Sequence, residues 1–341
     1  MLSAIVQSAG HVTVETVPDP VLPDDRGAVV KVDAAAICGS DLHFYDGDLP
    51  FFPIAPGHEA VGTVVEAGAA VRRFSVGDRV LITSVAGCGD CLGCATGDPI
   101  RCVGGAKVFG SGELGGAQSE LLAVPSADFN LLRVPEGVSD DDALLLTDNL
   151  ATGWIGAKRA QFAPGADVLV LGLGAIGLSA AKAALFLGAG RVFAADPVAG
   201  RRERAATFGA IPVEGATPEA ILATTGGRGV DAVIDAVALD ASMDDAFASV
   251  KAGGVISVIG VHSMEPYPMP LLMGLFRSVT LNLTTAPIQQ TWRELVPLVQ
   301  HGRLDTSGIF THAFPLAEAN DAYAAVAART AEVVKAKLVM P

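Results

Sequence analysis

The residues best equipped for chemistry lie between Cys38 and Glu59, in the segments Cys-Gly-Ser-Asp-Leu-His and Gly-His-Glu. This short stretch holds a thiol, two imidazoles, a hydroxyl and acidic side chains. A thiolate, a neutral imidazole and a carboxylate are typical ligands of a catalytic zinc that keeps one coordination position open. The stretch therefore indicates zinc chemistry, provided that the rest of the chain positions it.

A second group of thiols lies in a glycine-rich loop with the spacing C-x2-C-x2-C-x7-C: Cys88, Cys91, Cys94 and Cys102. Four thiolates at this spacing can close a tetrahedral shell around zinc and leave no position for a substrate. Two disulfides or unused thiols are the alternative, but the total of five cysteines argues against a complete disulfide framework. We predict a structural zinc that stabilises a small lobe, residues 87–103.

A third motif, G-x-G-x-x-G, is formed by Gly172, Gly174 and Gly177. It directly follows an apolar strand-like run and opens a helical stretch of small residues, which is the context of a dinucleotide-binding turn. The first glycine permits a tight turn, the second lets backbone N–H groups approach a pyrophosphate, and the third lets the helix pack closely on the sheet.

Asp196 stands nineteen positions after the last glycine of this motif, at the end of the next strand-like run. A carboxylate there accepts hydrogen bonds from the adenosine ribose and repels a 2′-phosphate, which favours NAD over NADP. Arg201, Arg202 and Arg204 keep NADP open as the alternative, because they could bind a phosphate.

Two kinds of elements must position these motifs. Up to about residue 150, short β-branched runs between Pro, Gly and Asp predict an antiparallel, barrel-like domain. From residue 167 strands alternate with helices, one of which we expect to begin at Thr217, and this alternation predicts a doubly wound sheet. The six expected strands are 168–171, 191–195, 211–213, 230–237, 255–259 and 279–283. After about residue 286 an Ala-rich helical stretch ends in a strand-like run, 337–340, which we expect to return to the first domain.

Length and charge narrow the class of protein. A chain of 341 residues favours two domains. The net charge of −14 would repel a phosphate backbone, so we expect no nucleic-acid partner. The N-terminus has no basic leader, and the longest apolar run, 168–181, is too short for a bilayer span. We therefore expect a cytoplasmic protein without a membrane partner.

In their order and spacing these motifs, together with Gly77-Asp-Arg-Val80, resemble the zinc-dependent medium-chain alcohol dehydrogenases over essentially the whole chain. The pattern is most similar to the bacterial secondary-alcohol dehydrogenases. The resemblance implies an α/β protein with a GroES-like β-rich catalytic domain, residues 1–150 and 287–341. A Rossmann NAD-binding domain with a six-stranded parallel sheet, residues 151–286, is inserted into it. It also implies a homodimer or homotetramer.

The resemblance implies a role for particular residues as well. Cys38 and His58 match the first two ligands of the catalytic zinc, and Asp148, four residues before a Thr-Gly pair, matches the third. Glu59 matches a residue that is either a direct fourth ligand or lies just behind the ligands. Neighbouring strand residues point to opposite faces, so His58 and Glu59 can share a metal only at a bend, which Gly57 makes plausible.

Further matches concern the proton and the cofactor. Ser40 and His43 match a relay that removes the alcohol proton, and Thr152 matches a residue that packs near the nicotinamide. Asp196 and Arg201 match the pair that holds the adenosine ribose. The implied cofactors are NAD and two zinc ions per chain, one catalytic and one structural.

The expected function is reversible hydride transfer between a secondary or small primary alcohol and NAD. A polyol or diol dehydrogenase, a non-catalytic NAD-binding zinc protein and a zinc-free enoyl or quinone reductase are alternatives. The set of Cys38, His58 and Asp148 argues against the zinc-free reductase. Five side chains favour an apolar small-molecule substrate, although core packing explains them equally well: Leu49, Phe51, Phe52, Leu114 and Trp154.

Overall fold

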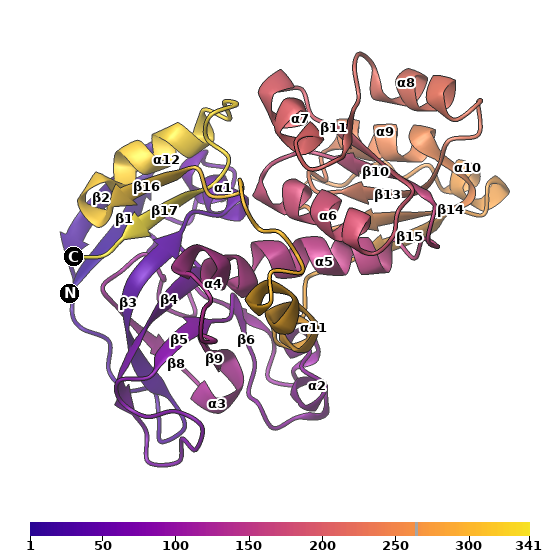
Figure 1. The fold of residues 1–341 in the computed structure, drawn as a ribbon. Coiled ribbons are helices and arrows are strands. Elements are labelled where there is room, and N and C mark those ends of the chain that lie inside the picture. Colours follow the sequence, from indigo (N-terminus) through magenta and orange to yellow (C-terminus); the bar gives the residue numbers. More distant parts are fainter. Residues whose placement is uncertain (263–264) are drawn as a thin grey trace. The chain divides into compact units, whose positions relative to one another are not determined.

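The computed structural model describes residues 1–262 and 265–341, which form two compact units (Figure 1). Unit 1 consists of Met1–Ala151 and Pro287–Pro341, and unit 2 consists of Thr152–Ala286. The first change from one unit to the other falls inside helix α5 (Asn149–Arg159). Within the two described ranges, no helix has both the length and the apolar character that a membrane span requires.

Unit 1 is built on a seven-stranded sheet in which all but one of the strand pairs are antiparallel. Its main path runs β16 (His312–Pro315), β17 (Ala336–Val339), β3 (Ala28–Ala36), β4 (Glu59–Ala67), β5 (Arg79–Ile82), β9 (Leu131–Arg133), and β8 (Leu121–Val124) also pairs with β3. The C-terminal β17 lies beside β3 from the N-terminal part of the chain (Figure 1). This largely antiparallel sheet agrees with the β-rich first domain that the sequence predicts.

Smaller elements complete unit 1. Two antiparallel pairs are β1 (Leu2–Ser8) with β2 (His11–Thr16), and β6 (Val85–Ala86) with β7 (Lys107–Val108). The helices are η1 (Gly39–Asp41), α1 (Leu42–Tyr45), α2 (Leu92–Ala95), η2 (Pro99–Arg101), α3 (Ala127–Asn130), α4 (Asp140–Thr147), α11 (Ile288–Gln300), η3 (Leu316–Glu318) and α12 (Ala319–Ala327). Of the two longer helices after residue 286, only α12 has the expected Ala-rich composition, and its buried face joins the core of unit 1.

Unit 2 is a six-stranded parallel sheet, as predicted. Its order is β12 (Ile211–Pro212), β11 (Arg191–Ala195), β10 (Asp167–Leu171), β13 (Val230–Asp235), β14 (Val250–Val258), β15 (Thr280–Leu283). Its helices are α6 (Ala175–Phe186), α7 (Ala199–Ala206), α8 (Thr217–Thr224), α9 (Asp240–Ser249) and α10 (Leu271–Phe276). The strand order reverses between β10 and β13, and the crevice at the carboxyl ends of these strands is where doubly wound sheets bind ligands.

Two strand boundaries in unit 2 differ from the predicted ones by more than one residue. β13 ends at Asp235 because the carboxylate of Asp235 accepts the N–H groups of Val237 and Ala238, which turns the chain away from the sheet. β14 begins at Val250, earlier than expected, because an irregular register lets its Gly-containing first half still pair with β13. Helix α8 begins at Thr217 with Pro218 in its first turn, as the sequence indicates.

Candidate functional site

Four potential metal ligands gather in unit 1. One ligand atom each of Cys38, His58, Glu59 and Asp148 lies within 4.8 Å of those of the other three. The Oδ2 atom of Asp148 is 3.6 Å from Sγ of Cys38 and 3.4 Å from Nε2 of His58. The arrangement joins residues up to 110 positions apart in the chain.

The sheet explains why these residues meet. Cys38 follows the end of β3, and Glu59 opens β4, the strand paired with β3 through Ala36 and Glu59. Gly57 has a φ of +100°, a left-handed conformation that favours glycine, so the chain bends before His58. His58 therefore precedes the strand and Glu59 begins it, which lets consecutive side chains reach one cluster.

Asp148 stands at the break between two helices. It caps the C-terminus of α4 with non-helical backbone angles, φ −155° and ψ −68°, and α5 begins at the next residue. An aspartate is poorly suited to a helix interior but is accommodated at such a break. The break places the carboxylate beside Cys38 and His58.

The electrostatics of this cluster favour a cation. Burial raises the pKa of the Cys38 thiol, and it raises the pKa of the Glu59 carboxyl despite the nearby Lys335 ammonium. Burial opposes charge on His58, but the negative groups around it, Asp41 foremost, bring its pKa well above the usual value. Closely spaced acidic groups of this kind are costly without a positive charge.

The donor set fits zinc. It offers one sulfur, one imidazole nitrogen and carboxylate oxygens, all of which zinc accepts in tetrahedral sites. Oε2 of Glu59 is buried and has no hydrogen-bond partner, whereas Oε1 accepts bonds from Lys335 Nζ at 2.6 Å and Asn149 Nδ2 at 2.9 Å. A buried carboxylate with one anchored oxygen and one unpartnered oxygen is consistent with a group that faces a metal.

Sequence reasoning missed two charged residues that hold the candidate ligands. Lys335 is buried and pairs with Glu59 across 276 positions of the chain. Asp41 is buried, with Oδ1 at 3.4 Å from Nδ1 of His58. A lysine inside the apolar run Val-Val-Lys-Ala is the signal for the first, since a buried lysine requires a partner. The sequence contains no comparable signal for Asp41.

The two residues expected to form a proton relay lie three positions apart in sequence and have different partners. Ser40 Oγ is 3.5 Å from Nε2 of His58, so its hydroxyl borders the metal cluster. His43 is partly exposed, and its Nδ1 lies 3.0 Å from Oδ2 of Asp48. Asp48 is a second carboxylate that the sequence analysis did not assign.

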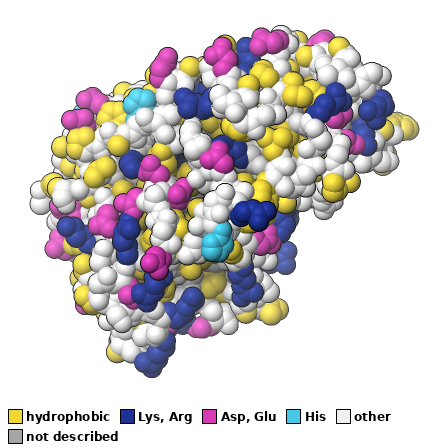
Figure 2. Space-filling model, viewed as in Figure 1, with side chains coloured by type: hydrophobic (Ala, Val, Ile, Leu, Met, Phe, Trp, Pro, Cys, Tyr) yellow, Lys and Arg dark blue, Asp and Glu magenta, His cyan; other side chains and the backbone are white. Residues whose placement is uncertain are grey.

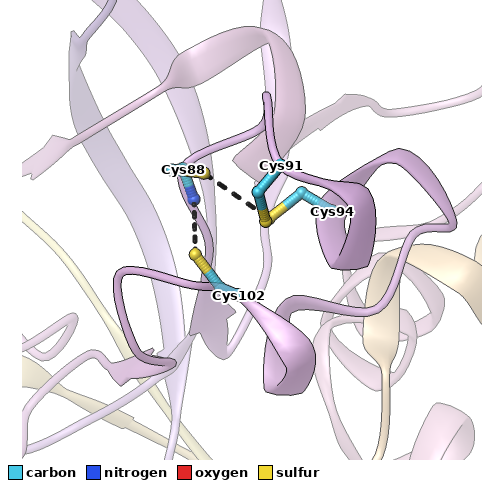
Figure 3. Close-up of side chains that lie close together, drawn as sticks. All are labelled: Cys88, Cys91, Cys94 and Cys102. Carbon is cyan, nitrogen blue, oxygen red and sulfur yellow. Dashed lines mark hydrogen bonds between the residues drawn. The ribbon is translucent and has the colours of Figure 1, made fainter.

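The four cysteines of the glycine-rich loop form a separate cluster in unit 1 (Figure 3). Their sulfur atoms lie within 4.8 Å of one another, with Cys88 and Cys94 at 4.0 Å, and all four are free thiols. Backbone N–H groups lower the pKa of Cys91 to about 6, whereas burial raises that of Cys94 to about 12. Four clustered sulfurs with no disulfide fit a closed zinc site.

The three glycines of the dinucleotide motif each occupy a position that requires a small residue or leaves room for a ligand. Gly172 follows β10 with a φ of +80°. Gly174 caps the N-terminus of α6, and a Cβ atom there would meet nothing within 4 Å. A Cβ atom on Gly177 would overlap the carbonyl oxygen of Gly172. The turn thus leaves open space at a helix N-terminus, which is where a pyrophosphate binds.

Asp196 lies beside this turn. Its Oδ2 accepts the N–H of Leu173 at 2.8 Å, and Nη1 of Arg201 is 3.8 Å from the same carboxylate. Arg202 donates to the backbone carbonyl of Asp196 at 2.6 Å and lies 3.3 Å from Glu214. The carboxylate and Arg201 are therefore held beside the glycine turn, directly after β11.

The five side chains considered for an apolar substrate pocket have dissimilar surroundings. Trp154 is buried in unit 2, with its ring 5.8 Å from that of Phe186. Phe52 and Leu114 pack against the core of unit 1, and Phe51 is exposed. Core packing accounts for three of them, so they no longer support an apolar substrate. Thr152, matched to the nicotinamide, is buried in α5.

Comparison with known proteins yields a consistent family. Residues 24–136 match the alcohol dehydrogenase GroES-like domain, and residues 175–301 match the zinc-binding dehydrogenase domain. A probable zinc-binding alcohol dehydrogenase of Mycobacterium tuberculosis is 56% identical over 98% of this chain and 88% of its own length.

Solved structures agree. The alcohol dehydrogenase of Thermus sp. ATN1 is 34% identical, with a TM-score of 0.93 and complete coverage of both chains. A short chain alcohol dehydrogenase from E. coli CFT073, solved as a complex with NADH, is 25% identical, with a TM-score of 0.87 and 99% coverage of both chains.

Proposed function

This chain belongs to the zinc-dependent medium-chain alcohol dehydrogenase family of oxidoreductases, and we propose that it oxidises a secondary or small primary alcohol with NAD. The reverse reaction would reduce the ketone or aldehyde. The observation that carries this proposal is the convergence of Cys38, His58, Glu59 and Asp148 in one buried cluster with the donor set of a catalytic zinc.

Two kinds of bound group would supply chemistry that side chains lack. When bound, zinc provides the Lewis acidity that makes an alcohol hydroxyl acidic, and NAD accepts the hydride. Cys38, His58 and Asp148 would hold the catalytic zinc, with Glu59 as a fourth ligand or just behind it. The structural zinc would be held by Cys88, Cys91, Cys94 and Cys102.

The chain's own residues would handle the proton. The Ser40 hydroxyl borders the ligand cluster, so it is placed to accept a proton from an alcohol that enters there. His43 is suited to hold that proton afterwards, because a neutral imidazole has one ring nitrogen that accepts a proton. The carboxylate of Asp48 on Nδ1 would keep the N–H on that side and leave Nε2 as the acceptor.

NAD is the cofactor that the surroundings of Asp196 favour. Gly172, Gly174 and Gly177 would accommodate the pyrophosphate, and Asp196 with Arg201 would hold the adenosine ribose. Arg202 is occupied by the Asp196 carbonyl and Glu214, which makes it less available to a 2′-phosphate. Thr152 would pack near the nicotinamide, and the complex of the related E. coli protein with NADH supports this choice.

The surface of unit 2 supports a homodimer or homotetramer. Helix α10 contributes no buried residue, and Leu271, Leu275 and Phe276 are 71, 75 and 80% exposed. Hydrophobic side chains gather at the right-hand end of the view in Figure 2, where Figure 1 places α10. The strand next to α10 in sequence, β15, ends the sheet and pairs only with β14 among the described strands. An apolar face next to an open sheet edge is typical of an interface with a second copy.

The direct test measures turnover and zinc together. The purified chain is assayed with NAD and NADP against a panel of alcohols, diols and ketones, and its zinc is counted by elemental analysis. We expect NAD-linked oxidation and two zinc ions per chain.

Cys38→Ala and Asp148→Ala should each abolish oxidation and lose one zinc, while NADH still binds. Asp141→Ala, which removes a carboxylate of α4 outside the cluster, is the matched control. Turnover that survives in Cys38→Ala or Asp148→Ala would overturn the assignment.

A further inference from the structure

We infer that Tyr323 and Gln118 are positioning residues that fix Asp41 and, through it, the His58 imidazole in the orientation that metal binding needs. This inference rests on the proposed role of His58 as a zinc ligand. Neither residue belongs to a motif that identifies the family in this sequence. Both come from segments far from His58 in the chain, and Tyr323 lies on α12 near the C-terminus.

The four side chains form one continuous, buried chain of polar contacts. The Tyr323 hydroxyl donates to Oε1 of Gln118 at 2.9 Å, and Nε2 of Gln118 donates to Oδ2 of Asp41 at 3.2 Å. Oδ1 of Asp41 then lies 3.4 Å from Nδ1 of His58. Tyr323 and Gln118 are 0% exposed, Asp41 is 1% exposed and His58 is 7% exposed, so water cannot readily replace any member.

Donor and acceptor rules permit only one direction of hydrogen bonding along this series of side chains. An ionised Asp41 only accepts, and its Oδ2 already receives the backbone N–H of Cys38 at 2.9 Å. Gln118 must therefore turn its NH₂ group to Asp41, which leaves its oxygen facing Tyr323. Tyr323 must then donate, and without its hydroxyl Oε1 of Gln118 would lose this donor, so that only the NH₂ contacts with Asp41 at 3.2 Å and the Ala36 carbonyl at 3.4 Å would hold the amide.

The same direction of hydrogen bonding determines the tautomer of His58. An Nδ1–H group that points to Asp41 leaves the lone pair on Nε2, and Nε2 is the atom that lies 3.4 Å from Asp148 in the cluster. A carboxylate behind a ligating imidazole both fixes the ring and increases its donor strength. A flipped Gln118 amide would place its oxygen against Oδ2 of Asp41, and the repulsion would displace that carboxylate from His58.

Zinc affinity distinguishes this role from simple core packing. Catalytic-site zinc is titrated with a competing chelator in the wild type, Tyr323→Phe and Tyr45→Phe, and Cys38→Ala identifies the signal of the structural site. We expect Tyr323→Phe to weaken catalytic-site binding by about tenfold, the usual effect of losing a group behind a ligand, without changing the structural site. Tyr45→Phe is the matched control. The Tyr45 ring is 5.4 Å from that of Tyr323, but its hydroxyl does not belong to the row of polar contacts from Tyr323 to His58.

A double-variant cycle makes the test sharper. Gln118→Met keeps the side-chain length but removes the contacts with Tyr323 and Asp41, together with the one to the Ala36 carbonyl, so Tyr323→Phe should add little to it if the two act in series. The unfolding temperature of the zinc-free protein is measured for every variant that folds. An unchanged zinc affinity in Tyr323→Phe, with only the unfolding temperature lowered, would overturn the inference, as would additive losses of affinity. A wild type without catalytic-site zinc would instead overturn the proposed function.

Discussion

At the scale of single residues, the most informative contact of the proposed relay is the one between His43 and Asp48. Oδ2 of Asp48 lies 3.0 Å from Nδ1 of His43. A carboxylate in this position keeps the N–H on Nδ1, so the other nitrogen is the one that accepts a proton. Asp48 is 60% exposed, so water screens the pair and limits its strength.

Asp48→Asn should therefore lower kcat/KM for alcohol oxidation. A neutral amide oxygen accepts the Nδ1–H group less strongly than a carboxylate does and holds the ring less firmly, so we expect a loss of roughly two- to fivefold, the size usual for an exposed pair. Steady-state kinetics at a fixed pH measure the change. Asp46→Asn is the control, since Asp46 pairs with Arg329. An unchanged kcat/KM would exclude a role for Asp48 in the relay.

The candidate ligands were accessible from the sequence, whereas the groups that support them were not. Cys38, His58 and Asp148 stand in recognisable spacings. Lys335 and Asp41 act through contacts that only the folded sheet creates. The apolar run around Lys335 signals that this lysine needs a partner, but not that the partner is Glu59, 276 positions away. The aromatic side chains considered for the pocket show the converse limit, because an apolar residue type does not distinguish a core from a binding surface.

At the scale of elements, the junction between β10 and α6 shows why the sheet of unit 2 could be predicted well. Its strands are continuous apolar runs, and a glycine turn marks the point where a strand becomes a helix. Strand ends were predicted less well where a side chain accepts hydrogen bonds from the backbone, as the Asp235 carboxylate does after β13. In unit 1 the composition indicates short strands, but the order of β16, β17 and β3 depends on pairing between the two ends of the chain.

Two alanine substitutions in the same turn should have opposite consequences. Gly177→Ala would force a Cβ atom into the Gly172 carbonyl, so α6 must move off the sheet, and we expect the free energy of unfolding to fall by roughly 3 kcal/mol. Gly174→Ala meets no atom within 4 Å and should cost less than about 1 kcal/mol. Its methyl group instead occupies the space proposed for the pyrophosphate, so NADH should bind at least about tenfold more weakly, or ~1.4 kcal/mol.

Denaturant unfolding and NADH fluorescence titration separate these two effects. The glycines then serve as controls for each other, because one substitution should change mainly stability and the other mainly affinity. Equal NADH affinity in Gly174→Ala and the wild type would show that the dinucleotide does not approach this helix N-terminus. A fully stable Gly177→Ala would mean that α6 does not need its close contact with the turn.

At the scale of the whole molecule, the exposed face of α10 is difficult to explain for a monomer. Large apolar side chains usually lie at the surface singly, but Leu271, Leu272 and Met273 are consecutive and each is more than half exposed. The neighbouring β15 also leaves backbone groups along one edge without a strand partner among the described residues. Natural proteins cover or blunt such edges, and a second copy across a twofold axis can cover both features.

A charged substitution in this face should therefore reduce the mass of the assembly. The wild type should elute as a dimer or tetramer. A stable pair of subunits buries about 800 Å² on each of them. The double substitution Leu275→Asp and Phe276→Asp places two carboxylates on each copy of the face, and burying them would cost more than the contact provides. We expect the mass from light scattering to fall by at least half.

Leu92→Asp, an equally exposed position in the cysteine lobe, should leave the mass unchanged. A monomeric wild type, or an unchanged mass in the double variant, would show that α10 does not form the interface.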